Sequence, residues 1–237
     1  MSDILLVHGS CHGAWCWRDV VPALEALGHR ARAIDLPGHG KNPCPIEEVT
    51  LEAYGDAILD ALERPAIVVG HSMAGFAIAA AAERAPDAIE RLVFLCAYAP
   101  RDGRSLVEMR MEAPRQPLLA AIEKTGDGLG FVFREDRTRD ALYHDCPEGT
   151  VAYAAEHLCV QAIRPQATPI RLGANYECVK KSYIRCTEDR AIPPEYQETM
   201  TEGWPSEDVH ALPLGHSPFF ADPNGLAALL DRIAGGD

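Results

Sequence analysis

Residues 67–75 of the chain are Ile67-Val68-Val69-Gly70-His71-Ser72-Met73-Ala74-Gly75. An apolar, β-branched run leads into a serine, and an alanine-rich helical pattern follows from Phe76 to Ala85. This order predicts a buried strand, a sharp turn that carries Ser72, and a helix. Such a turn would project the Ser72 hydroxyl above the sheet and aim the start of the helix at a reacting carbonyl group. Ser72 is therefore the predicted nucleophile, and the amide of Met73 is a predicted donor to the oxyanion of the transition state.

Small residues flank this serine because the tight turn brings the helix backbone close to the strand. Gly70 stands two residues before Ser72. Two residues after it, where glycine is usual, this chain has Ala74 with Gly75 behind it. A serine at the start of a helix is in general more often an N-cap than a nucleophile. The order of strand, small residue, serine, small residue and helix favours the nucleophile here.

Short apolar runs alternate with helical patterns on both sides of this motif. The strand-like runs are residues 4–8, 30–35, 66–69, 91–95, 182–186 and 208–212. The helical patterns are residues 16–27, 51–62, 73–84, 193–201 and 223–233. Thr50 is placed to cap the second of these helices, and Gly28 is placed to end the first. The alternation predicts an α/β chain with a mostly parallel central sheet flanked by helices, and residues 1–237 are few enough for a single domain.

The alternation breaks between about residues 100 and 174. This part holds amphipathic pieces around 104–124 and 148–163, separated by Gly126-Asp127-Gly128 and several prolines. A structureless loop of this length is uncommon in a compact domain. We therefore expect a helical cap, residues 100–174, inserted after the strand at 91–95. Five apolar side chains of the cap are candidates to line a substrate pocket, although ordinary packing would also explain each of them: Met109, Met111, Leu118, Phe131 and Phe133.

The composition limits the partners of the chain. A formal net charge of −13 favours solubility and disfavours binding to nucleic acid or to an anionic membrane. The chain shows neither a signal-like amino terminus nor a long apolar run, so we expect a cytoplasmic protein that is not inserted into a membrane. Its eight cysteines include no C-x-x-C pair and are expected to be reduced thiols. No ligand spacing predicts a metal, and no motif predicts a cofactor.

A glycine-rich segment follows the first strand-like run. It consists of His8-Gly9-Ser10-Cys11-His12-Gly13-Ala14-Trp15. A serine nucleophile needs a second amide for the oxyanion, and a loop after an earlier strand supplies it, so Ser10 is the predicted donor. Gly9 and Gly13 would let the backbone approach the substrate. A phosphate-binding loop is the alternative, but the segment lacks the G-x-G-x-x-G pattern and no Lys-Ser/Thr pair follows it.

Position along the chain selects the base among nine histidines. With this type of nucleophile turn the catalytic triad runs serine, acid, histidine, and His216 lies in a loop between the last strand-like run and the last helical pattern. An imidazole with a pKa near ~6.5 can accept and return a proton at neutral pH. The loop after residues 182–186 offers two acids, Glu188 and Asp189. Asp189 lies deeper in the turn and is the predicted partner of His216, although a loop aspartate is more often a turn former.

With these residues in place, the chain resembles the plant methylesterase and hydroxynitrile lyase branch of the α/β hydrolases over nearly its whole length. Segments 7–17, 24–29, 141–146 and 187–197 are similar to blocks of that family. The resemblance implies the α/β-hydrolase fold with an inserted cap, and it supports Asp189 as the acid.

The resemblance admits two chemistries on one triad. The S-selective lyases of the family carry Thr where this chain has Gly9 and Lys where it has Ser217. The R-selective lyases carry Asn at the first position, whereas esterases of the family have glycine there. The resemblance therefore implies a serine hydrolase, a carboxylesterase that cleaves small-molecule esters without a cofactor.

Other functions remain open at this point. A hydroxynitrile lyase is the nearest alternative, and thioesterases and carbon–carbon bond hydrolases share the triad. A ligand receptor that keeps the fold is disfavoured by the intact triad, and epoxide hydrolases and dehalogenases need a carboxylate where Ser72 stands. Substrate contacts are predicted at Gly9, His71, Phe131 and Ser217. The acyl and alcohol groups of the substrate are not specified, and a homodimer is left open.

Overall fold

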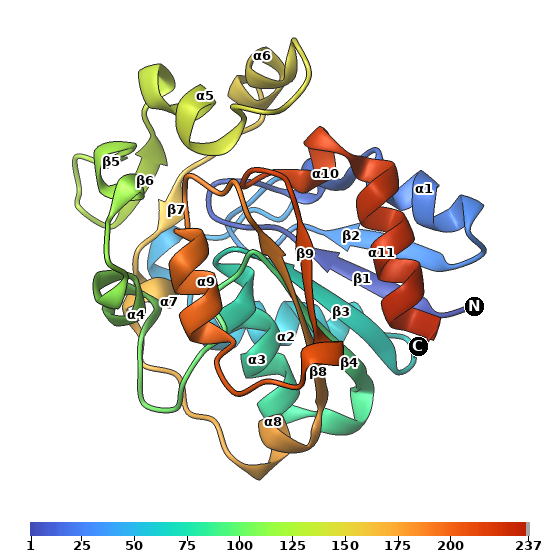
Figure 1. Cartoon of the computed structure of the whole chain (residues 1–237). Helices are drawn as coiled ribbons and strands as arrows, with labels where there is room; N and C mark the ends of the chain where they lie inside the picture. The colour runs from blue at the N-terminus through green and yellow to red at the C-terminus, as the bar shows by residue number, and fades with distance from the viewer. Residues whose placement is uncertain (236–237) are drawn as a thin grey trace.

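Six strands form one parallel sheet in the computed structural model, which describes residues 1–235 (Figure 1). Their order across the sheet is β2-β1-β3-β4-β8-β9. The strands are β1 (Asp3–Val7), β2 (Arg30–Ile34), β3 (Ala66–His71), β4 (Ile89–Leu95), β8 (Lys180–Cys186) and β9 (Val209–Leu212). Every neighbouring pair runs parallel. Each strand falls on a predicted apolar run, so the prediction of a mostly parallel sheet is confirmed.

Successive side chains of the strands enter two separate apolar cores, one on each face of the sheet. Leu5 and Val68 pack on one face, whereas Leu6 and Val69 pack on the other. The first face is covered by α2 (Leu51–Asp60), α3 (Ala74–Arg84), α8 (Ala174–Cys178) and α9 (Pro194–Met200). The second is covered by α1 (Val20–Ala26), α10 (Pro218–Ala221) and α11 (Pro223–Gly235). Because each fully buried aliphatic side chain contributes roughly 1.5–3 kcal/mol, a strand buried on both faces is held strongly in register.

The ends of the helices follow the predicted turn chemistry. The Thr50 hydroxyl accepts a hydrogen bond from the Ala53 amide at 3.0 Å, which makes Thr50 the N-cap of α2. Gly28 adopts a φ of +90° just after α1, the left-handed conformation that suits glycine at a helix end. Short 3-10 helices complete the connections at Ala14–Trp17, Ile46–Glu48, Pro86–Ala88, Pro117–Ala120 and Ser206–Asp208. Within residues 1–235, every helix is too short or too polar to span a membrane.

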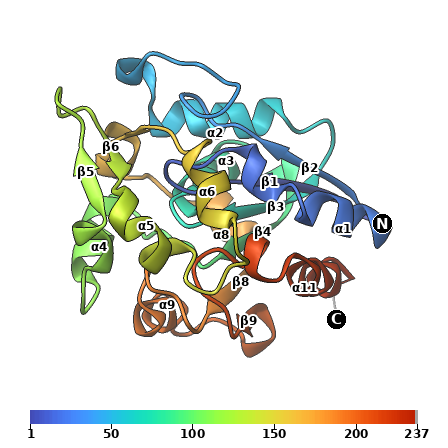
Figure 2. The same cartoon turned by 90° about the horizontal axis from the view of Figure 1, so that it is seen from above.

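Most of the segment between β4 and β8 forms a cap beside the sheet, whereas α8 at its end packs against the first face (Figures 1 and 2). Its helices are α4 (Leu106–Glu112), α5 (Glu135–Leu142), α6 (Thr150–Ala155) and α7 (Arg164–Ala167). Its strands are β5 (Ile122–Lys124), β6 (Gly130–Phe133) and β7 (Gln161–Ala162), which form an antiparallel sheet of their own. The cap is therefore helical only in part.

A hairpin replaces the expected break between two helical pieces of the cap. Lys124 pairs with Phe131, so β5 and β6 run antiparallel through the turn at residues 125–130. The Asp127 carboxylate accepts from the Thr125 hydroxyl at 2.5 Å and from the Leu129 amide at 2.9 Å. Gly128 takes a φ of +73° in the same turn. Glycine and aspartate, expected to separate helices, instead build a tight strand connection.

Candidate active site

Ser72 lies on a sharp turn between β3 and α3. Its φ is +55°, a left-handed conformation that costs a residue with a side chain about 1–2 kcal/mol. The Ser72 amide donates to the Leu95 carbonyl at 3.2 Å, and the Ser72 carbonyl accepts from the amides of Gly75 and Tyr98 at 3.2 and 3.1 Å. These bonds hold the strained turn against the end of β4 and the segment after it.

The small residues around the serine leave room for this turn. A Cβ atom added to Gly70 would lie 2.9 Å from the Ala74 carbonyl oxygen. A Cβ atom added to Gly75 would lie only 2.1 Å from the Tyr98 carbonyl oxygen. Ala74, at the position where glycine is usual, is accommodated and fully buried. The turn therefore requires a glycine at position 75, one residue after the position where glycine is usual in this motif.

Three buried side chains form a continuous chain of hydrogen bonds. The Ser72 Oγ lies 3.1 Å from the Nε2 of His216, and the Nδ1 of His216 lies 2.8 Å from the Oδ2 of Asp189. Ser72 is 6% exposed, His216 3% and Asp189 2%. With Nδ1 donating to the carboxylate, Nε2 is left as the acceptor for the serine proton. The structure thus brings together the three residues that the sequence predicted as a triad.

The loop after β8 distinguishes the two candidate acids. The Oδ1 of Asp189 accepts from the amides of Ala191 and Ile192 at 2.7 and 2.9 Å, and its Oδ2 also accepts from the Gln197 side chain at 2.9 Å. Charge-assisted bonds of this kind stabilise an ionised carboxylate. The neighbouring Glu188 is exposed. The geometry therefore pairs His216 with Asp189 and leaves Glu188 in solvent.

His71 supports His216 from behind. Its Nε2 donates to the His216 carbonyl at 2.8 Å, and its Nδ1 has no partner among residues 1–235. Burial, reinforced by a charge on His216, lowers the pKa of His71 well below its usual value, so His71 is neutral at physiological pH. His71 does not line the cleft at Ser72. Its predicted contact with substrate is thus replaced by a contact with the base.

His71, Cys96 and His216 place possible metal-ligating atoms within 4.8 Å of one another. Both nitrogens of His216 are already engaged by Ser72 and Asp189. The Cys96 thiol donates to the His216 carbonyl at 3.6 Å, and burial raises its pKa well above the usual value. A thiol that remains protonated is a poor metal ligand. These contacts are those of a packed shell around the imidazole.

Ser10 and Met73, the predicted oxyanion donors, both lie in the cleft beside Ser72. Neither of their amides donates to an acceptor within the described part of the chain. The Ser10 loop is fixed by His12, whose Nδ1 donates to the Ser10 carbonyl at 2.7 Å and whose Nε2 accepts from the Tyr143 hydroxyl at 2.7 Å. Burial lowers the pKa of His12 to about 4, so the ring stays neutral and keeps this arrangement. Two free amides are what a developing oxyanion requires.

A narrow cleft, which we call the Ser72 cleft, opens between the sheet and the cap. The space in and directly in front of it, open solvent included, is about 330 Å³. Its polar residues are Ser10, Ser72, Tyr98, Arg110 and Gln166. Its apolar residues are Met73, Leu106, Leu118, Ile122, Phe131 and Phe133. Leu118, Phe131 and Phe133 therefore lie where the sequence predicted.

Four other predicted contacts lie elsewhere. Met109 is 1% exposed and belongs to the core under α4, and Met111 is 57% exposed, so neither of these candidates lines the Ser72 cleft. The packing or surface role that the sequence left open describes both. Ser217 is fully buried, and its hydroxyl has no partner among residues 1–235. Gly9 lies directly behind the nucleophile, since an added Cβ atom would lie 2.9 Å from the Ser72 Cβ.

Three polar residues of the cleft were missed from the sequence: Tyr98, Arg110 and Gln166. Gln166 is buried and donates to the Ser10 hydroxyl at 2.9 Å. This bond connects α7 of the cap to residues 8–15, which we call the oxyanion loop. Arg110 comes from α4 and Tyr98 from the segment after β4. In the sequence Arg110 stands between two predicted pocket residues, Met109 and Met111, whereas Tyr98 and Gln166 have no such neighbour. Single polar residues in a cap usually face solvent, so the sequence did not mark them.

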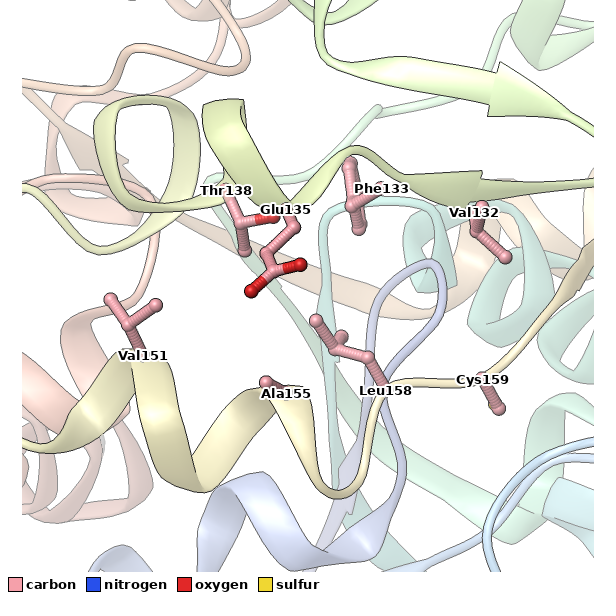
Figure 3. Close-up of a pocket in the computed structure, with 8 residues that line it drawn as sticks. All are labelled: Val132, Phe133, Glu135, Thr138, Val151, Ala155, Leu158 and Cys159. Atoms are coloured by element: carbon pink, nitrogen blue, oxygen red, sulfur yellow. The ribbon is translucent and has the colours of Figure 1, made fainter.

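A larger pocket lies within the cap, away from the nucleophile (Figure 3). It has an empty volume of about 620 Å³ and lies between β6, α5 and α6. The lining residues are Val132, Phe133, Glu135, Thr138, Val151, Ala155, Leu158 and Cys159. Ser72 is not among them, so size alone does not mark the reactive site. Phe133 lines both cavities and forms part of the wall between them.

Comparison with known proteins agrees with this geometry. Residues 4–229 match a family described as "Alpha/beta hydrolase family". The chain belongs to this family. It is 32% identical over 261 residues to Esterase PIR7B of Oryza sativa subsp. japonica, and the match covers 98% of this chain and 96% of the relative. It is also 32% identical over 257 residues to Methylesterase 1 of Arabidopsis thaliana, with the same coverage of 98% and 96%. The predicted resemblance to the plant methylesterase branch is confirmed.

Solved structures give the same fold. A pyrethroid hydrolase from Sphingobium faniae superimposes with a TM-score of 0.88 at 28% sequence identity, and the match covers 99% of this chain and 97% of that one. A methylesterase from Arabidopsis superimposes with a TM-score of 0.87 at 24% sequence identity, and the match covers 100% of both chains. The prediction of the α/β-hydrolase fold is therefore confirmed.

Proposed function

We propose that this chain is a serine carboxylesterase that cleaves small esters through an acyl-enzyme on Ser72. The observation that carries the proposal is the hydrogen-bonded series Ser72, His216 and Asp189 beside a cleft that holds two unengaged amides. The names of the relatives, an esterase and a methylesterase that each match over 96% of their own length, support ester hydrolysis.

The first half of the reaction forms the acyl-enzyme. His216 takes the Ser72 proton at Nε2 while Ser72 Oγ attacks the ester carbonyl carbon. The negative charge that develops on the carbonyl oxygen is stabilised by the amides of Ser10 and Met73, the latter at the positive end of the α3 dipole. Asp189 stabilises the imidazolium. The carbon–oxygen bond to the alcohol then breaks, and His216 returns its proton to the departing alkoxide.

The second half releases the acid. His216 takes a proton from a water molecule, whose oxygen attacks the acyl carbon. The same two amides stabilise the second oxyanion. The bond to Ser72 Oγ then breaks, and His216 protonates that oxygen, which regenerates the enzyme. The apolar side of the cleft limits the entry of bulk water around these charges.

Hydroxynitrile cleavage lacks the side chains that it would need. An added Cβ atom at position 9 would lie 2.7 Å from the Nδ1 of His71, so Gly9 offers no hydroxyl and has no room for one. Ser217 is buried and uncharged and offers no cation to a departing cyanide. An anion that leaves into an apolar site without a partner is costly.

A direct test combines labelling with a substrate panel. A fluorophosphonate probe should label the wild type at Ser72, and Ser72→Ala should abolish labelling and reduce hydrolysis of short aliphatic and aryl esters by about 10⁴-fold or more. Mandelonitrile should remain uncleaved. Labelling of another residue, or benzaldehyde release that depends on Ser72, would contradict the proposal.

A further inference from the structure

Arg110 contributes an unpaired positive charge to the Ser72 cleft. Its side chain lines the cleft together with Ser10, Ser72 and Met73. Its Nε is buried and has no hydrogen-bond partner in the described part of the chain. No carboxylate of residues 1–235 lies within 4.0 Å of its guanidinium nitrogens. A guanidinium held partly out of water without an anion is unfavourable, so this charge calls for a partner.

The carboxylates of α4 form ion pairs with arginines other than Arg110. Glu112 pairs with Arg101 and also lies 3.7 Å from Arg104, and Glu108 lies 4.0 Å from Arg104. Glu108 also closes a capping box with Ser105, whose amide donates to the Glu108 carboxylate at 2.8 Å. The helix that carries Arg110 is thus anchored at its start, and its own acids do not neutralise Arg110.

A structural role in α4 accounts for only part of this arrangement. Arg110 lies in the last turn of the helix, where a cation interacts favourably with the helix dipole. That interaction requires no contact with the cleft, and an arginine serving it alone would extend into water. The side chain instead forms a wall of the cavity that contains the nucleophile.

Tyr98 supplies a neutral donor in the same cleft. Its amide donates to the Ser72 carbonyl at 3.1 Å, so its backbone is fixed relative to the nucleophile. Burial raises the pKa of Tyr98 even though the Arg110 charge acts to lower it, so the hydroxyl is protonated at neutral pH. Tyr98 is only 3% exposed and lines the cleft together with Arg110. A guanidinium and a phenol in one cleft form a pair of donors suited to a carboxylate.

We propose that the preferred substrates are esters that carry a free carboxylate, such as half-esters of short dicarboxylic acids. The ester carbonyl would lie between Ser72 and the amides of Ser10 and Met73, while the carboxylate binds Arg110 with Tyr98 as a second donor. The proposal rests on the proposed esterase function and specifies its substrate class. The net charge of −13 does not oppose it at contact distance, because its field is screened within about 8 Å at physiological ionic strength.

The test compares matched pairs of esters. The monoethyl esters of succinic, glutaric and adipic acids are each paired with the ethyl ester in which a carboxamide replaces the carboxylate, and acid release is followed by titration. For at least one chain length, the wild-type kcat/KM for the charged ester should exceed that for its amide about 10-fold or more. Arg110→Met should bring this ratio close to 1, a loss of about 10-fold or more, and Arg110→Lys should retain part of it because the charge remains.

Arg104→Met is the matched control, since it removes the same charge from an exposed position beside α4 and should keep the wild-type ratio. A second measurement needs no variant: glutarate or adipate should inhibit hydrolysis of an uncharged ester by the wild type more strongly than the corresponding diamide does. Equal rates on charged and amide esters, or a ratio that Arg110→Met leaves unchanged, would overturn the inference while leaving the esterase proposal intact. Failure to hydrolyse any ester of the panel would overturn the esterase proposal itself.

Discussion

Asp189 accepts four hydrogen bonds, so replacing one of its carboxylate oxygens by an NH₂ group tests its role as the acid of the triad. Asp189→Asn keeps the size of the side chain but can donate to the Nδ1 of His216, which forces the proton onto Nε2 and blocks its role as base. We expect kcat to fall on the order of 10³- to 10⁴-fold, measured with a short aryl ester. Glu188→Gln is the control and should change kcat less than about twofold, because Glu188 is exposed. Reversed behaviour of the two variants would place the acid at Glu188.

Gly9 shows how little space lies behind the nucleophile. The Cβ atom of Gly9→Ala would lie 2.7 Å from the His71 Nδ1 and 2.9 Å from the Ser72 Cβ, so one of these residues must move. Because a misplacement of about 1 Å at a reacting group can cost 10²-fold, we expect kcat to fall about 100-fold. Gly126→Ala is the control, because an added Cβ atom there faces open space in the described structure. Wild-type turnover by Gly9→Ala would show that the oxyanion loop is more adaptable than its packing indicates.

At the level of elements, the sheet and the triad were predictable because their signals are local. Each strand is an apolar run next to a loop, and Ser72, Asp189 and His216 each follow such a run at the carboxyl end of a parallel strand. The residues flanking Ser72 also restrict its turn strongly. Physical chemistry of short segments was sufficient for this part of the site.

The cap was less predictable because its elements are short and their placement depends on distant contacts. β7 has two residues and β5 has three, too few to show an alternating pattern. Arg110 was missed because its role depends on which way α4 faces once the cap is folded. Met109 and Met111, two residues apart on one helix, point to the core and to solvent for the same reason.

A hydrogen bond joins the cap to the loop that carries His216, and it predicts that the cap helps to position this histidine. The Asp145 Oδ2 accepts from the Gly215 amide at 2.6 Å, next to His216, so Asp145 acts as a positioning residue. Asp145→Ala should lower kcat about 10-fold through the misplaced imidazole, whereas Asp145→Asn retains an acceptor oxygen and should recover most of the activity. Kinetics of both variants on one ester provide the measurement.

Asp140→Ala is the control for this pair, since Asp140 is an exposed cap aspartate that pairs with Arg190, and such pairs contribute about 0–1 kcal/mol. If Asp145→Ala matched the wild type in kcat, the loop of His216 would be positioned without the cap.

For the whole molecule, buried neutral histidines predict sensitivity to acid. Burial lowers the pKa values of His8, His12 and His71 below the usual 6.5, that of His12 to about 4. In the unfolded chain these rings protonate below about pH 6.5, whereas in the folded chain they do not. The unfolded state then binds more protons, so the free energy of unfolding falls as the pH decreases from 6.5 toward 4. Each such histidine contributes a slope of up to about 1.4 kcal/mol per pH unit.

Urea unfolding at pH 7.5, 6.5 and 5.5 measures this effect. The free energy of unfolding should fall only moderately between the first two values and about three times as much between pH 6.5 and 5.5, above the range in which most carboxylates titrate. Stability that rises between pH 6.5 and 5.5 would show that these histidines protonate inside the folded protein.

The order of the strands has a consequence for how the enzyme fails on heating. Ser72 follows β3 in the interior of the sheet, whereas His216 follows β9, a four-residue strand at the edge of the sheet that pairs with β8. Edge elements open with less free energy than central ones. If β9 frays, His216 would therefore move away from Ser72 while the hydrophobic core is still intact. We expect catalysis to cease several degrees below the temperature at which circular dichroism reports melting, so that β9 rather than the core sets the working temperature range.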